Sequence, residues 1–262
     1  MIIFNSTPFK NGKWLMHELL SKDSELCNHL PYTLEATMEN IKIMMKQHDR
    51  LFIKPCYSNI GKGIMHMNKT ETGEWVLHVR NERQTWIQIN FLHELPEVLV
   101  NAITSRPYIV QERITLAKYK GRNFDTRVIV QKNESGEWAI TGKVGKLAQM
   151  GNVITNVGLG GDFADIMTFL DLNPQFSSNI ICEEIDKLSL KIAKYLENYC
   201  YHIADLGMDL GVAQNGMIYF IECNFRSQYS GMEKNTDLLA ICENVYENPI
   251  RYRSFLLRQM IT

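Results

Sequence analysis

Apolar positions along the chain follow two spacings, one typical of helices and one typical of strands. They fall on a single helical stripe between Thr37 and His48, and on a longer stripe from Ile185 to Ile203 that includes Tyr199. Helices are predicted at residues 12–22, 37–48, 92–104, 183–203 and 235–247. Strands are predicted at residues 51–55, 64–67, 75–79, 108–112, 125–132, 138–144 and 217–224.

These elements interleave without the strict alternation of a doubly wound sheet. An α+β fold is therefore predicted, built from antiparallel sheets with packed helices. Two similar segments, ETGEW at 71–75 and ESGEW at 134–138, place a glycine between a polar run and an aromatic-led apolar run. That pattern predicts two hairpin turns.

Composition and charge narrow the class of protein. The chain has 262 residues, of which 45% are hydrophobic and 22% charged, enough for one large domain or two joined lobes. Its formal net charge of -1 disfavours nucleic acid as a partner. No stretch approaches the ~20 apolar residues of a membrane span, and no secretory signal opens the chain, so a cytoplasmic protein without a membrane partner is expected.

The cysteines are scattered without the spacing of a metal site, which favours free and mostly buried thiols. Cys223 lies between Glu222 and Asn224 and could be read as a nucleophile. Alternation along a strand favours the other reading, in which its side chain points away from these neighbours and into the core.

A first candidate site is the loop Ser58-Asn59-Ile60-Gly61-Lys62-Gly63, which follows a strand that ends in Lys54. Gly61 and Gly63 permit the positive φ with which backbone N–H groups can surround an anion. Lys54 could deliver its ammonium group to the same phosphate. The alternatives remain an ordinary hairpin turn and a lysine at the edge of a sheet.

A second candidate site joins Asp125, Arg127, Lys143 and Lys146 on two strands that the 134–137 turn connects. Asp125 and Arg127 share a face because side chains alternate along a strand, and Lys143 is expected to pair across with either. Converging cations can bind a polyphosphate or stabilise a charged transition state. The alternative is a solvated face with surface ion pairs.

The third candidate site consists of Asp209, Glu222 and Asn224, on two strands joined by a turn at Asn215-Gly216. Two carboxylates and an amide oxygen on one face form the oxygen-rich ligand set that magnesium prefers. Glu222 and Asn224 also interrupt an apolar strand, which is costly without a bound partner. A magnesium site is predicted here.

Taken in order, the motifs IKP, VQERI, FDTRVIVQ, TGKVGKLAQ, TNVGLGG and MDLG…FIECN resemble ATP-grasp proteins of the spore-coat-associated YheC/YheD type. The match extends from about Phe9 to the last helix, and RimK-type glutamate ligases are similar more distantly. The resemblance implies an ATP-grasp fold whose two lobes clasp the nucleotide. It implies three segments, namely an N-terminal helical remnant (1–50), a lid lobe (51–110) and a C-terminal lobe with the metal site (111–262).

The resemblance also implies roles for single residues. Arg127, Lys143 and Lys146 would lie where the γ-phosphate and an acyl phosphate bind, with the choice between the two lysines left open. Asp209, Glu222 and Asn224 would bind magnesium. ATP would be contacted by Lys54, Ser58, Gly61, Lys62, Gly63, Gln111, Glu112, Ile114 and Asp125.

The implied reaction is ATP- and magnesium-dependent activation of a carboxylate as an acyl phosphate, followed by attack of an amine or another nucleophile. A ribosomally made peptide is the leading substrate, because the chain has little room for an acceptor domain. Expected partners are thus a small-molecule or peptide carboxylate, a peptide or protein acceptor, and a second copy in a homodimer. Two alternatives remain, a kinase that only transfers phosphate and a non-catalytic ATP-binding scaffold in a spore or assembly complex.

Overall fold

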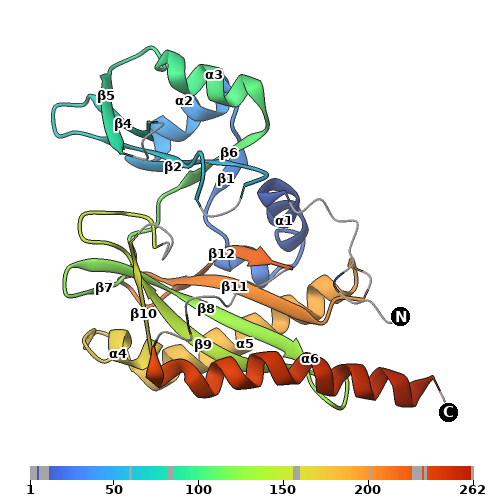
Figure 1. Ribbon diagram of the computed structural model, residues 1–262. Coiled ribbons are helices and arrows are strands. Elements are labelled where there is room, and N and C mark those ends of the chain that lie inside the picture. The colour runs from blue at the N-terminus through green and yellow to red at the C-terminus, as the bar shows by residue number, and fades with distance from the viewer. Residues whose placement is uncertain are drawn as a thin grey trace. The chain divides into compact units, whose positions relative to one another are not determined.

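The computed structural model describes residues 5, 12–58, 61–81, 85–155, 160–200, 202–225, 232 and 235–260. The chain divides into two compact units (Figure 1). Unit 2 comprises Lys10–Ile114, and unit 1 comprises Met1–Phe9 together with Thr115–Thr262. Among the described residues, no helix combines the length and the apolar character that crossing a membrane requires.

The strands of unit 2 form an antiparallel sheet in the order β1-β6-β2-β3-β4-β5. Their bounds are Thr33–Glu35 (β1), Arg50–Pro55 (β2), Met65–Lys69 (β3), Trp75–Arg80 (β4), Trp86–Phe91 (β5) and Tyr108–Glu112 (β6). The helices are Lys13–Leu20 (α1), Met38–Gln47 (α2) and Glu97–Ser105 (α3), with a 3-10 turn at Leu26–His29 (η1). Since β1 pairs with β6, and α2 contacts both β2 and β6, residues 13–50 are part of this unit and not a separate segment.

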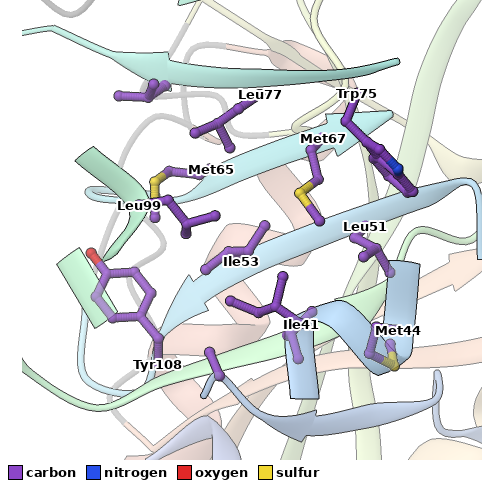
Figure 2. Packing of buried hydrophobic residues seen from close by; sticks show 13 residues of the cluster. Ile41, Met44, Leu51, Ile53, Met65, Met67, Trp75, Leu77, Leu99 and Tyr108 are labelled. Carbon is purple, nitrogen blue, oxygen red and sulfur yellow. The ribbon is translucent and has the colours of Figure 1, made fainter. Parts of the chain in front are cut away.

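Side chains alternate along β2, so that every second one points into the core of unit 2 and the others point to the opposite face of the sheet. Leu51 and Ile53 are fully buried in the core with Ile41 and Met44 of α2 (Figure 2). The residues between and after them, Phe52 and Lys54, project to the other face of the sheet. Lys54 therefore lies on the face opposite the core, because side chains alternate along the strand.

The strands of unit 1 form a second antiparallel sheet in the order β10-β9-β8-β11-β12, with β7 paired to β8. Their bounds are Lys118–Tyr119 (β7), Arg122–Lys132 (β8), Trp138–Leu147 (β9), Asp162–Ala164 (β10), Asp205–Val212 (β11) and Ile218–Asn224 (β12). The helices are Ile166–Leu170 (α4), Ser178–Glu197 (α5) and Leu239–Gln259 (α6), with a 3-10 turn at Thr236–Leu238 (η4). Two units with antiparallel sheets and packed helices make this an α+β fold, as the sequence predicts.

Helices cover both faces of the unit 1 sheet. Lys143 of β9 reaches Asp186 of α5, whereas the next residue, Val144, packs with Cys242 and Val245 of α6. Neighbouring residues of a strand point to opposite faces, so α5 and α6 lie on opposite sides of the sheet. The face that carries α6 also carries the charged residues described next, farther along the strands.

Candidate functional site

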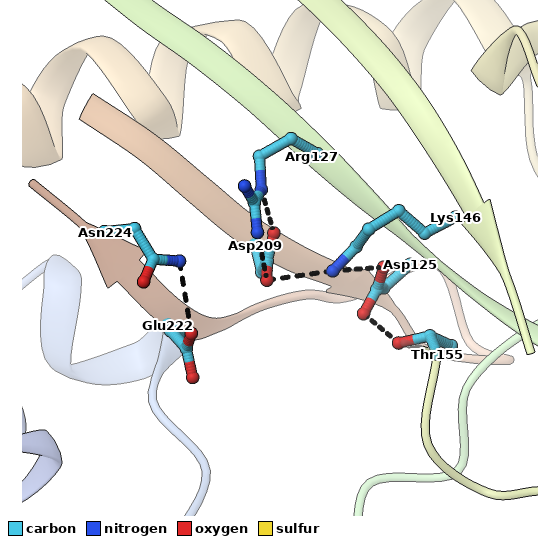
Figure 3. Close-up of polar contacts among 7 residues, drawn as sticks. All are labelled: Asp125, Arg127, Lys146, Thr155, Asp209, Glu222 and Asn224. Atoms are coloured by element: carbon cyan, nitrogen blue, oxygen red, sulfur yellow. Dashed lines mark hydrogen bonds and ion pairs between the residues drawn. The ribbon is translucent and has the colours of Figure 1, made fainter. Parts of the chain in front are cut away.

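Four charged side chains meet on the α6 side of the unit 1 sheet (Figure 3). Asp125 and Arg127 lie on β8, two residues apart, and therefore share a face. Register places Lys146 of β9 opposite Asp125, and Asp209 of β11 opposite Arg127. Three neighbouring strands thereby bring Asp125 and Asp209 together, although these residues are 84 positions apart in the sequence.

Asp209 is the centre of this group. Arg127 donates to it twice, from Nε to Oδ1 at 2.5 Å and from Nη2 to Oδ2 at 3.0 Å. Lys146 Nζ lies 2.8 Å from Asp209 Oδ2 and 3.1 Å from Asp125 Oδ1. A guanidinium group that donates two hydrogen bonds to one carboxylate is fixed in orientation as well as in position. Asp209 therefore orients Arg127, and its contact with Lys146 positions the second cation.

Burial and charge act in opposite directions on these groups. Burial by itself would raise the pKa of Asp209, but Arg127 and Lys146 overcome it and lower that pKa to about 2. Burial would lower the pKa of Arg127 and of Lys146, and their carboxylate neighbours raise both instead. Both cations therefore stay protonated in a buried position.

Asp125 differs from Asp209 although both carboxylates are buried. Burial raises its pKa to about 6, against the lowering effect of Lys146, and the charge of Asp209 raises it further. Its second oxygen accepts a hydrogen bond from the Thr155 hydroxyl. The sequence assigns Asp125 to ATP binding, and the structure places it beneath Lys146, where it is 2% exposed.

Glu222 and Asn224 extend the group on β12. Glu222 lies directly opposite Asp209, and a register shift between Asp209 and Leu210 separates this pair from the rest of the ladder. Asn224 Nδ2 donates to Glu222 Oε1 at 3.1 Å. Cys223 between them is buried, and burial raises the pKa of its thiol, which agrees with its predicted position in the core.

The predicted magnesium ligands fit a metal ion in part. Glu222 and Asn224 offer a carboxylate and an amide oxygen, the donor types that magnesium prefers. Both oxygens of Asp209 already accept from Arg127 or Lys146, so Asp209 could bind a metal only by giving up one of those bonds. No group of three His, Cys, Asp or Glu suited to a metal ion occurs among the described residues.

Lys143 is not part of the group, contrary to its predicted pairing with Asp125 or Arg127. It lies opposite Val128, and its ammonium group is 2.8 Å from Asp186 Oδ2 on α5. Lys143 and Lys146 are three positions apart on one strand, an odd number, and therefore point to opposite faces. Of the two lysines that the sequence left open, the structure brings only Lys146 to Arg127.

In unit 2, Lys54 is buried at 8% exposure and donates to Gln111 Oε1 at 2.6 Å. The Gln111 amide in turn donates to the Thr33 hydroxyl at 2.8 Å. Two residues from the predicted ATP site therefore contact one another directly. This hydrogen bond runs to a neutral amide, whereas Arg127 and Lys146 contact a carboxylate.

Glu112 accepts a hydrogen bond from the Tyr32 backbone N–H at 2.8 Å and lies 3.4 Å from Nδ1 of His48. Its carboxylate is thus engaged within unit 2. Ile114 is the last residue of that unit and has no regular secondary structure.

The predicted phosphate loop is described in part, because Asn59 and Ile60 lie outside the described residues. Gly61 and Gly63 have φ values of 69° and 76°, the positive φ that the sequence predicts. A Cβ on Gly63 would come within 2.6 Å of the Arg106 guanidinium, so a larger residue there would displace the end of that side chain as well as strain the backbone. Ser58 accepts from Lys13 through its carbonyl at 3.4 Å, and Lys62 is exposed.

Sequence reasoning missed a group of aromatic and cationic residues on the Lys54 face of unit 2. Phe52, beneath the Lys54 ammonium, makes an edge contact with His66, which stacks on His78 at 4.2 Å. The group consists of Phe52, His66, His78, Arg80, Trp86 and Arg113, and we call it the histidine cluster. The alternation in IMHM and WVLHV, which places one histidine of each segment opposite the core side, is the signal that could have indicated it.

The two arginines of the histidine cluster are half-buried, and among the described residues neither forms an ion pair with a carboxylate. Arg113 Nη1 lies 3.3 Å from His66 Nδ1, and the Arg80 guanidinium is 4.5 Å from the Trp86 ring centre. Burial, followed by the charge of Arg50, lowers the pKa of Arg113 to about 10. Burial, His78 and the two arginines lower the pKa of His66 to about 3.

Comparison with known proteins identifies the family of this chain. The model of the YheC/D-like ATP-grasp family matches residues 1–256. The chain belongs to that family. The endospore coat-associated protein YheD of Bacillus subtilis (strain 168) is 26% identical over 263 residues, which cover 99% of this chain. The same alignment covers 57% of YheD, so this ATP-grasp chain spans little more than half the length of that relative.

Solved structures share the fold at low sequence identity. The VanG D-Ala:D-Ser ligase of Enterococcus faecalis superposes with a TM-score of 0.54 at 15% identity, covering 92% of this chain and 61% of that one. The macrocyclase MdnC of Microcystis aeruginosa MRC, bound with precursor peptide MdnA, gives 0.51 at 14% identity, covering 90% and 60%. The ATP-grasp fold therefore extends over nearly all of this chain.

Proposed function

We propose that this ATP-grasp protein is a ligase that uses ATP and magnesium to activate a carboxylate and then joins it to an amine or another nucleophile. The observation that carries the proposal is the Arg127–Asp209–Lys146–Asp125 group, which holds two protonated cations on one face of a rigid sheet. Family membership makes ATP the expected co-substrate.

In the proposed reaction a carboxylate oxygen attacks the γ-phosphorus of ATP, and the bond from that phosphorus to the bridging oxygen breaks to release ADP. The nucleophile then attacks the acyl carbon of the acyl phosphate, inorganic phosphate leaves, and an attacking amine loses a proton. Negative charge develops on the transferring phosphoryl group. Arg127 and Lys146 are suited to stabilise it, because Asp209 already holds both cations on one face of the sheet.

Glu222 and Asn224 are the residues proposed to hold magnesium. Their two oxygen donors leave coordination positions for water and phosphate. A phosphate that binds Arg127 or Lys146 would compete with Asp209 for these cations and could free a carboxylate oxygen for the metal. Lys54 and Gln111 of unit 2, with the loop at 61–63, are proposed to contact the phosphates of ATP.

A peptide carboxylate is the proposed substrate class. MdnC, which shares the fold, is a macrocyclase bound with a precursor peptide, whereas VanG is a D-Ala:D-Ser ligase. The two indicate that one fold serves peptide and small-molecule acceptors alike. The peptide is favoured for this chain because MdnC, whose fold matches over 90% of it, is bound with a precursor peptide.

The test is the mass of the product formed from a candidate peptide, ATP and magnesium. Loss of water indicates internal ligation, and the mass of an added residue indicates joining of an amino acid. A gain of one phosphate without ligation would replace the ligase by a kinase. Absence of ADP formation with every carboxylate and peptide offered would leave an ATP-binding scaffold and overturn the proposal.

A matched pair of lysines on β9 tests the site. Lys146→Met removes a cation from the proposed transition-state group and should lower kcat by about 100-fold, the usual effect of deleting one such donor. Lys143→Met removes the same charge from the opposite face and should leave kcat within about threefold. Equal losses in the two variants would show that position on the sheet face does not matter, contrary to the proposal.

Glu222→Gln tests the metal site separately. The variant keeps size and hydrogen bonding but removes an anionic ligand, so the extra thermal stability that ATP and magnesium give should fall sharply. Without ligands it should be about as stable as the parent, because the amide keeps the size and the hydrogen-bonding capacity of the carboxylate. A variant that melts earlier without ligand but keeps the full ATP–magnesium shift would make Glu222 a structural residue.

A further inference from the structure

Helix α6 carries a second apolar stripe, separate from the one that packs on the sheet. Cys242, Val245 and Tyr252 are buried against unit 1. Positions separated alternately by four and three residues along the other side are all exposed. They are Leu239, Glu243, Tyr246, Ile250, Arg253, Leu257 and Met260, which we call the outer stripe.

This alternation of four and three is the heptad spacing with which two helices pack along a common seam. Five members of the outer stripe are apolar or aromatic, and Ile250 and Met260 are 67% and 75% exposed. The helix has 21 residues, which corresponds to a length of about 32 Å. In Figure 1, α6 runs along the outside of unit 1. The outer stripe is therefore a continuous surface on an outward-facing helix.

Contacts on the opposite side hold α6 firmly to the sheet. Pro249 lacks an N–H, so the Val245 carbonyl four residues earlier loses its helical partner. The buried Gln131 of β8 supplies the missing donor, with its Nε2 3.1 Å from that carbonyl oxygen. Asn248 adds a 3.1 Å hydrogen bond to the Thr141 hydroxyl of β9. The sheet thereby fixes which side of α6 faces outward.

The charges of the outer stripe specify how a second copy would pack. Three couples of outer-stripe residues lie symmetrically about position 248, because the two residue numbers of each couple sum to 496. The couples are Leu239 with Leu257, Glu243 with Arg253, and Tyr246 with Ile250. In an antiparallel pair centred on Asn248, the members of each couple would thus face one another across the seam. Within these couples each apolar side chain would meet an apolar one, and each Glu243 would meet an Arg253.

A parallel pair would behave differently. Identical positions would face one another, so Glu243 would meet Glu243 and Arg253 would meet Arg253, and like charges in a seam are repulsive. The exposed charges beside the seam agree with the antiparallel direction, because Glu247 lies in the first half of α6 and Arg251 and Arg258 lie in the second. Antiparallel pairing brings acidic and basic halves together.

We propose that the outer stripe of α6 is a homodimer interface, in which two copies of this chain pack their last helices antiparallel around Asn248. The apolar pairs supply the affinity, and the two symmetric Glu243–Arg253 pairs supply the direction. A single pair of helices is a small interface, so the dimer should dissociate on dilution. The proposal is independent of the ligase reaction, which involves other residues.

The first experiment is sedimentation velocity of the whole chain between about 1 µM and about 300 µM, a range that spans weak to moderate association. The parent should pass from monomer to dimer, and Ile250→Glu should remain a monomer throughout. Asn244→Glu places the same charge at an exposed position of α6 outside the stripe and should dimerise like the parent. Circular dichroism and thermal unfolding of the variants verify that the fold is retained.

The second experiment fixes the direction. Glu243→Arg and Arg253→Glu should each weaken the dimer at least tenfold, since each places like charges opposite one another. The double variant Glu243→Arg/Arg253→Glu should restore the parent dissociation constant. A parallel dimer would respond to none of these changes in this pattern. Three results would overturn the proposal: a monomer at every concentration, a dimer unaffected by Ile250→Glu, or charge variants without rescue.

Discussion

The two sheets of this protein carry buried cations on one face each, but they neutralise them in different ways. In unit 1, Arg127 and Lys146 share the carboxylate of Asp209, and their pKa values are raised. In unit 2, Lys54 donates to an amide, and Arg113 lies against His66, whose pKa falls to about 3. The unit 1 cations are thus neutralised by carboxylates, whereas Arg113 and Arg80 in unit 2 lie beside a histidine and an aromatic ring, where an added anion would be favourable.

This difference has a consequence for stability and for binding. When a buried cation has a carboxylate partner, removing that partner leaves the charge uncompensated and lowers the free energy of unfolding. A cation that lies beside neutral groups keeps its charge available to a bound phosphate. We therefore expect substitutions in unit 1 to act mainly on stability and turnover, and substitutions in unit 2 to act mainly on nucleotide affinity.

The largest expected effect is that of removing the central carboxylate of unit 1. Asp209→Ala removes the carboxylate that both Arg127 and Lys146 contact, and should lower the free energy of unfolding by about 3–5 kcal/mol. Asp186→Ala is the matched control, because it removes the half-buried partner of Lys143 and should cost less than about 1 kcal/mol. Urea unfolding measures both. Similar losses would mean that the buried group has no special dependence on Asp209.

The next effect concerns Lys54 in unit 2. Lys54→Ala should weaken ATP binding by about 10- to 100-fold, the range for loss of a hydrogen bond to a charged group, while the fold is retained. Lys69→Ala is the control, since Lys69 is an exposed lysine on β3 of the same sheet. Titration calorimetry gives the two affinities. Unchanged affinity in folded Lys54→Ala would remove Lys54 from the nucleotide site.

The smallest effect is a pH dependence whose sign differs between the units. The pKa of Asp125 is raised to about 6, so its contribution to stability is present below pH ~4 and is lost as pH rises through ~6. The pKa of His66 is lowered from 6.5 to about 3, so its contribution is present above pH ~6.5 and is lost as pH falls towards ~3. In the parent these two slopes oppose one another between pH 4 and 6.

Single substitutions should separate the two slopes. Relative to the parent, Asp125→Asn should lose more stability on going from pH 6 to pH 4, and His66→Phe should lose less, each by about 1 kcal/mol or more. Urea unfolding at both pH values provides the comparison. If both variants shift in the same direction, the opposite environments of the two groups are wrong.

Local sequence patterns predicted much of the scaffold. The strand at 108–112 has the predicted bounds, and the 71–75 and 134–138 segments connect β3 to β4 and β8 to β9 as predicted hairpin turns. Gly73 and Gly136 have the positive φ that such turns require. These features depend on neighbouring residues alone, and a pattern of a few residues is therefore sufficient to specify them.

Element ends were predicted less well. The helix expected at 183–203 runs from Ser178 to Glu197, and Tyr199, expected in its buried stripe, lies beyond its end and is 45% exposed. The helix expected at 92–104 begins at Glu97, and the strand Trp86–Phe91 that precedes it was not predicted. Helix α6 continues to Gln259 instead of ending near residue 247. In α6 the sheet provides the donor that Pro249 removes, which no local pattern can indicate.

The sequence by itself determined the α+β class, the alternation that keeps Lys54 off the core, and the pairing of Asp209 with Glu222 across a turn. Only the tertiary structure decided that Lys146 and not Lys143 joins Arg127, that Asp209 is bound by two cations, and that histidines stack beneath two arginines. The physical reason is distance along the chain. Periodicity assigns a face to each side chain, but register between remote strands decides which charges share that face, and burial then sets their pKa values.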